Sequence, residues 1–272
     1  MSHEMYENDT AIYFEKEAWH GLGTVVTERY EPREALRIAG LDYQIIPSTS
    51  IDFNYTDSAG HKESGTTTAK VANVREDTGD VVGWVSPNYQ VLQNSELAEV
   101  AYSIAGDDTK VETFGSLRNG SRIYCLINMS EFDADKNGKD TIQQYMLLCN
   151  GHDGTLAFSG LPTSIRVVCS NTLNMALNTG NKNMIRITHS GDMAEKIMSA
   201  KDAMFTYREI GRFFEDTVQD LASKEWTTKT IQKFWLDMYG MIEEPFSTNP
   251  QTDEEHAEYT KALTTVNTWA ET

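Results

Sequence analysis

The segment KVETFGSLRNGSRIYCLINM, residues 110–129, gives the clearest indication of the fold. It holds two short runs of β-branched and aromatic residues, 110–117 and 121–129, on either side of a Gly-containing turn. Runs of this kind are typical of strands, and a connection of a few residues permits only antiparallel pairing. We therefore expect an antiparallel sheet built around these two segments.

The same pattern recurs on both sides of this stretch. Further strands are predicted at residues 43–53, 66–75, 81–92, 141–149, 155–158 and 164–169. A helix is predicted from Asn94, a good capping residue, to the stop at Gly106, and a shorter one over 31–40. Short strands with tight turns favour antiparallel pairing over alternating strand-helix-strand units.

Beyond Gly191 the apolar residues change to helical spacing, with Asp192 and Glu195 forming a possible capping box. Two more helices are predicted, one from Thr227 or Thr228 and one from Thr252. The predicted fold class is therefore α+β, with an antiparallel sheet core and a flanking helix, followed by a mainly helical C-terminal region. The predicted domains are a mixed core at 1–190 and a helical region at 191–272.

The composition is that of a folded acidic protein. Of 272 residues, 39% are hydrophobic, and 41 acidic against 23 basic side chains give a net charge of −18. This excludes a disordered acidic chain and a wholly basic nucleic-acid binder. The three cysteines suit reduced thiols, and we find neither a leader peptide nor a long apolar run. We expect a cytoplasmic protein with no membrane association.

One long segment lacks acidic residues. Between Asp153 and Asp192 there is no Asp or Glu, whereas the segment contains Arg166, Lys182 and Arg186. It is also rich in asparagine, including Asn171, and amides are suited to phosphate contacts. This predicts a surface that binds anions or nucleic acid. A buried strand followed by an Asn-rich loop would equally exclude carboxylates, because burying them is costly.

Two motifs could carry chemistry. His152 and Asp153 lie in a glycine-rich turn and could act as an acid/base pair, although Asp153 could simply cap backbone amides there. Cys169 could serve as a nucleophile with His152 as base, but a cysteine that ends an apolar strand is usually inert. No metal site or cofactor is predicted. Residues 133–144 begin like a calcium loop, but Gln144 replaces the final glutamate, so we expect a hairpin turn instead.

Four ordered motifs carry a family resemblance: WHGLG (19–23), GWVSPNYQVLQN (83–94), NGHDG (150–154) and RVVCSNTL (166–173). Over residues 15–235 the chain resembles the uncharacterised phage/plasmid-like protein family, also called domain of unknown function 932. The tail beyond about residue 240 does not resemble it. The motif residues singled out are Trp19, His20, Gly21, Gly23, His152, Asp153, Gly154 and Asn171.

The resemblance implies a mobile-element setting among genes for recombination, repair or anti-restriction, and it implies no catalytic residue. The leading hypothesis is a non-enzymatic protein of DNA metabolism, possibly homo-oligomeric, that binds single-stranded nucleic acid or host or phage DNA-handling proteins, as an annealing accessory would. One alternative is an anti-defence protein that sequesters a nucleotide signal or mimics DNA. Another is an enzyme that uses His152 and Asp153.

Overall fold

A computed structural model describes residues 5–6, 8–105, 110–133, 141–179, 184–224, 227 and 230. The chain divides into two compact units, residues 1–217 and 218–272, and the elements that position the candidate sites lie in the first. Of the helices predicted from Thr227 or Thr228 and from Thr252, almost every residue lies outside the described part. So do residues 134–140 of the calcium-like segment.

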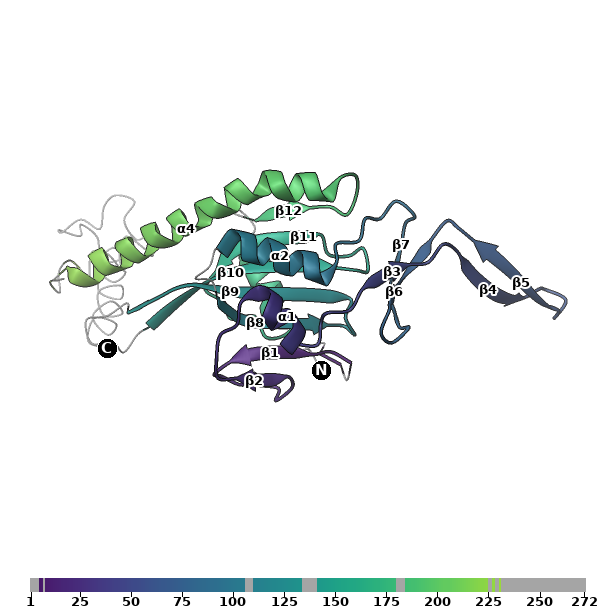
Figure 1. Ribbon diagram of the computed structural model, residues 1–272, viewed down its shortest axis with the longest axis horizontal. Coiled ribbons are helices and arrows are strands. Elements are labelled where there is room, and N and C mark those ends of the chain that lie inside the picture. Colours follow the sequence, from purple (N-terminus) through teal and green to yellow (C-terminus); the bar gives the residue numbers. More distant parts are fainter. Residues whose placement is uncertain are drawn as a thin grey trace, which may run out of the picture. The chain divides into compact units, whose positions relative to one another are not determined.

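The first unit is organised around a seven-stranded sheet with the order β12-β11-β10-β9-β8-β1-β2 (Figure 1). Its strands are β1 (Ala11–Phe14), β2 (Thr24–Val26), β8 (Lys110–Leu117), β9 (Arg122–Asp133), β10 (Thr141–Gly151), β11 (Phe158–Thr163) and β12 (Ile185–Ile187). The stretch 110–129 supplies β8 and most of β9, which pair antiparallel from Lys110↔Asn128 to Leu117↔Arg122. All neighbours in this sheet are antiparallel except β1 and β2, which run parallel.

Two smaller sheets precede the main strands in the chain. One has the order β3 (Ile45–Pro47), β6 (Val71–Arg75) and β7 (Val81–Val85), and the other is the hairpin of β4 (Ile51–Thr56) and β5 (Lys62–Thr67). The long strands predicted at 43–53 and 66–75 are therefore each divided between two sheets. The turns at 57–61 and 76–80 form where the Asp- and Gly-rich sequence predicts them.

Helices cover both faces of the main sheet. The apolar positions of α1 (Pro32–Ile38), α2 (Asn94–Ala105) and the first turns of α4 (Met193–Ser223) are buried against one face, called here the α2 face. Figure 1 shows α1 and α2 lying across this sheet. Helix α3 (Ser170–Thr179) buries Leu173 and Ala176 against the opposite face, called here the α3 face.

The predicted α+β class is wrong, because the fold is mostly β. Twelve strands and four helices are present in the described part of the chain, and residues before position 40 contribute β1 and β2 to the sheet. Such short strands are stabilised by their neighbours in the sheet and carry little periodic signal.

After residue 191 the helix that is described is α4, which begins as predicted. The strand expected at 155–158 begins only at Phe158 as β11, the one expected at 164–169 is absent, and the Asn-rich loop is helix α3 instead.

Candidate nucleic-acid interface

The exposed side of α3 carries amides and no charge. Its sequence, SNTLNMALNT, contains no charged residue. Its start is fixed by the Thr172 hydroxyl, which accepts hydrogen bonds from the N–H groups of Val168 (2.9 Å) and Cys169 (3.1 Å). With Leu173 and Ala176 turned to the sheet, the asparagines at 171, 174 and 178 follow the i, i+3, i+7 spacing of one helix face, and all three are exposed.

An exposed tryptophan lies next to His20, which is anchored to the segment just before α3. The Leu22 N–H donates to Nδ1 of His20 (3.1 Å), so Nε2 of His20 carries the proton and donates to the Val168 carbonyl at 3.0 Å. The Tyr13 hydroxyl donates to the same carbonyl at 3.3 Å. Trp19, which is 67% exposed, contacts the His20 ring edge to face at 5.4 Å. The structure therefore joins the first and fourth family motifs.

Arg166 is tied into the fold rather than presented to solvent. Its Nε donates to Glu112 Oε1 at 2.9 Å, and its Nη2 donates to the carbonyls of Phe14 and Lys16, both at 2.9 Å. Glu112 is buried in β8 and also pairs with Arg29 at 3.2 Å. The guanidinium of Arg166 thus connects the end of β1, β8 and the segment before α3.

Arg186 lies on the same face of the sheet but near the other edge. Its neighbours in β12, Ile185 and Ile187, pack on the α2 face, so strand alternation directs the exposed Arg186 to the α3 face. Three strands lie between β12 and β8 in the sheet, so the two strands are about 19 Å apart at ordinary strand spacing. The structure therefore does not bring Arg166 and Arg186 together, and Lys182 lies outside the described residues.

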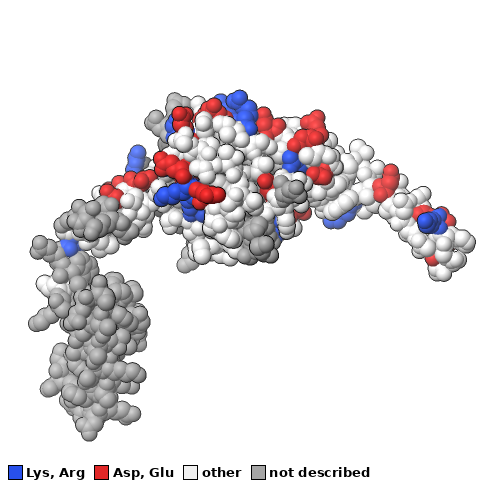
Figure 2. Space-filling view, turned by 90° about the horizontal axis from the view of Figure 1, so that it is seen from below, with Lys and Arg blue, Asp and Glu red and all other residues white. Residues whose placement is uncertain are grey.

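The charge around this surface is mixed. Glu15 and Glu17 are exposed in the turn that leads to Trp19, and Lys16 is exposed between them. Acidic and basic side chains are interspersed in the same way on the described part of another side of the molecule, the one that Figure 2 presents. Any anion bound here would meet few cations, and stacking and amide contacts would supply much of its affinity.

His152 lies at a buried polar node on the α2 side, where the second and third family motifs meet. Its Nε2 is 2.9 Å from Oδ1 of Asn94 at the start of α2, and its carbonyl accepts a hydrogen bond from Asn73 Nδ2 at 2.7 Å. His152 is fully buried, and burial lowers its pKa to about 3, so the ring is neutral near pH 7. A neutral, inaccessible imidazole of this kind is unsuited to take a proton from a substrate.

Close packing fixes this node. A Cβ added to Gly83 in β7 would lie 2.3 Å from the His152 carbonyl oxygen and 2.5 Å from Cα of Asp153. The Tyr89 hydroxyl donates to the Gly151 carbonyl. The Asp153 carboxylate accepts hydrogen bonds from the N–H (2.8 Å) and hydroxyl (2.7 Å) of Thr155, which is a turn-capping role. These contacts indicate that the residues around His152 have a structural role.

The described residues form neither a catalytic pair of Cys169 with His152 nor a metal centre. Cys169 is buried beside Thr172 on the α3 face, whereas His152 bonds to α2 on the opposite face. No group of three or more His, Cys, Asp or Glu within the described ranges could hold a metal ion. No described helix is both long and apolar enough to span a membrane.

Residues 81–270 match the family model described as Domain of unknown function (DUF932). The chain belongs to this family. The DUF932 match includes the tail beyond residue 240, although the four motifs indicate that this tail does not resemble the family. The match begins after the Trp19 motif. No curated protein and no solved structure matches the chain.

Sequence reasoning missed two features of the α3 face. The helix itself was readable in principle, because Leu173, Ala176 and Leu177 have the i, i+3, i+4 spacing of an apolar helix face. The position of Trp19 beside α3 had no local signal, because the hydrogen bond that holds it joins residues 148 positions apart.

Proposed function

We propose that this protein binds single-stranded nucleic acid on the α3 face and acts as a non-enzymatic accessory factor of DNA metabolism. The observation that carries the proposal is the exposed indole of Trp19, anchored through His20 beside an acid-free helix with a row of exposed amides. Stacking platforms of this kind bind bases without strong sequence preference.

Each part of the surface has a role in the proposal. A base stacks on Trp19, which supplies affinity independent of charge. The asparagines at 171, 174 and 178 offer donors and acceptors to phosphates and base edges. Arg186 supplies a cationic contact at the far side of the face. Since Glu15 and Glu17 lie close to Trp19 in the chain, we expect only a modest dependence of affinity on salt.

The non-enzymatic part of the proposal rests on the state of the candidate catalytic groups. His152 is buried and neutral, and the carboxylate of Asp153 caps a turn. The acidic surface, with a net charge of −18, favours the second candidate function, an anti-defence protein that engages a partner through its carboxylates.

Fluorescence anisotropy with a labelled single strand tests the proposal. A strand of about 20 nucleotides is long enough, because single-strand-binding OB folds cover at most ~16 nucleotides each. Trp19→Ala should weaken binding about 5-fold or more at ~50 mM salt, because one base-stacking contact is lost. The matched control is Trp84→Ala, since Trp84 is exposed on β7 and takes no part in the α3 face. It should leave binding unchanged.

A second pair of variants separates charge from stacking. Arg186→Ala should reduce the slope of log affinity against log salt by about one unit, whereas Arg37→Ala, an exposed arginine on α1, should not change it. If the parent binds no single strand at low salt, or if Trp19→Ala and Trp84→Ala bind equally well, the nucleic-acid proposal is wrong. The anti-defence candidate then becomes the better explanation.

A further inference from the structure

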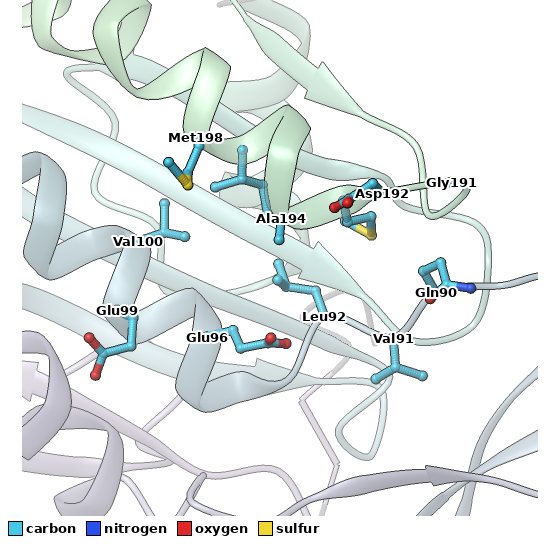
Figure 3. A pocket seen from close by; sticks show the side chains of 12 residues that line it. Gln90, Val91, Leu92, Glu96, Glu99, Val100, Gly191, Asp192, Ala194 and Met198 are labelled. Carbon is cyan, nitrogen blue, oxygen red and sulfur yellow. The ribbon is translucent and has the colours of Figure 1, made fainter.

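A groove with an apolar floor and an acidic rim lies between α2 and the first turns of α4 (Figure 3). Its volume is about 620 Å³, within the range of about 300–1,000 Å³ that is usual for ligand sites. Leu92, Val100 and Ile197 contribute to the floor. The groove is on the α2 face, opposite to the surface proposed for nucleic acid, so the two inferences are independent.

Two methionines make the floor adaptable. Met193 and Met198 both line the groove, and Met198 is 68% exposed. Methionine is unbranched and polarisable, and surfaces that accept varied apolar partners use it heavily. An exposed methionine beside buried Val100 and Ile197 extends the apolar surface outward, where a partner could cover it.

Every charged side chain that lines the groove is acidic. Glu96 Oε2 accepts the Gln93 N–H at 2.7 Å, and Asp192 Oδ1 accepts the Glu195 N–H at 3.0 Å. These are helix-capping bonds to backbone N–H groups. Glu99 is paired with Arg33. Among the ion pairs of the described residues, neither Glu96 nor Asp192 has a cationic partner.

We propose that this groove binds a basic amphipathic segment of a partner protein. An amphipathic helix would place its apolar side chains on the methionine-lined floor, as helix-in-groove complexes do, while its Lys or Arg residues reach Glu96 and Asp192. Charge complementarity selects this occupant over two others. Residues 236–272 of this chain hold eight acidic and one basic residue, and a second copy carries the same net charge of −18, so the acidic rim disfavours both.

The test uses a fluorescent model peptide of leucine and lysine arranged with helical apolar spacing. Two control peptides accompany it: one of the same composition in scrambled order, and one with glutamate in place of lysine. The full chain should bind the amphipathic basic peptide and bind both controls at least ~10-fold more weakly, because the groove requires both an apolar face and positive charge. Equal binding of the scrambled peptide would mean attraction to net charge alone and would overturn the proposal.

Substitutions locate the binding. Met198→Gln should weaken binding of the peptide about 10-fold, because an apolar contact is lost. Glu96→Gln should weaken it about 3-fold, since Gln preserves the capping bond but removes the charge. The matched controls are Met175→Gln on the exposed side of α3 and Glu34→Gln on α1, which should bind as the parent does. Unchanged thermal melting would show that all four variants fold.

Two results would contradict the proposal. One is peptide binding that responds equally to Met198→Gln and Met175→Gln, which would place the site elsewhere. The other is self-association of the full chain in sedimentation experiments that Met198→Gln abolishes, which would make a second copy the occupant.

Discussion

Acidification should destabilise this protein through His152, and the hydrogen bonds around the ring give the reason. Asn94 Nδ2 donates to the Leu41 carbonyl at 3.0 Å, so Asn94 Oδ1 is the acceptor for His152 Nε2–H. The other ring nitrogen, Nδ1, is buried and has no hydrogen-bond partner among the described residues. A second proton would therefore create an unpaired charge in the core. Burial, with a smaller contribution from His189, lowers the pKa of His152 to about 3.

The sign and size of the effect follow from proton linkage. Because the pKa of His152 is lower in the folded chain than its ordinary value of about 6.5, the unfolded chain takes up the proton first as the pH falls. The stability that the neutral His152 ring contributes is fully present above about pH 6.5. Between that pH and about pH 3 the free energy of unfolding decreases by about 1.4 kcal/mol per pH unit. Between neutral pH and pH 5 this amounts to about 2 kcal/mol of the free energy of unfolding.

Urea unfolding near pH 7.5 and near pH 5, on the parent and on His152→Gln, measures the effect. Gln can still donate to Asn94 Oδ1 but does not titrate, so the variant should lose about 2 kcal/mol less than the parent on acidification. The control is His61→Gln, because His61 is an exposed residue of the β4–β5 hairpin. Equal pH dependence in the parent and in His152→Gln would refute the reasoning. Should the variant not fold, a His152 imidazole NMR signal that titrates near pH 6.5 in the parent would refute it as well.

Further predictions concern stability and thiol reactivity. Arg166→Ala should lower the free energy of unfolding by about 2–4 kcal/mol in urea melts, because Glu112 loses one of its two arginine partners in a buried site; a loss below about 1 kcal/mol would show that the pair is not structural. Gly83→Ala should lower the melting temperature, because its Cβ would overlap the His152 carbonyl, whereas an unchanged melting temperature would contradict the close approach. The three buried cysteines should react with a thiol reagent only after unfolding, since burial raises the pKa of the Cys149 thiol to about 12; rapid reaction of the native protein would disprove this. Calcium or a chelator should leave the melting midpoint unchanged, since Gln144 replaces the bidentate glutamate of a calcium loop, and a saturable shift would overturn that expectation.

Elements whose signals lie within a few residues of one another can be predicted from the sequence alone. The cap at Asn94 and the stop at Gly106 predict α2, which spans Asn94–Ala105. Asp192 caps the start of α4 as its spacing predicts. Segment 110–117 is β8, and its Gly-containing turn leads into β9. Each of these features depends on local hydrogen bonds and backbone preferences, which neighbouring side chains specify.

The contacts of the distinctive residues depend on the tertiary structure. The short strands β1 and β2 form because β8 offers an edge to pair with, and this made the predicted fold class wrong. Arg166 belongs to a predicted anion surface, but its guanidinium bonds to Glu112 and to two carbonyls about 150 positions away. His20, the neighbour of Trp19, is held near the start of α3 by its hydrogen bond to the Val168 carbonyl. Local pattern cannot specify such pairs, because their partners are chosen by which segments the sheet brings side by side.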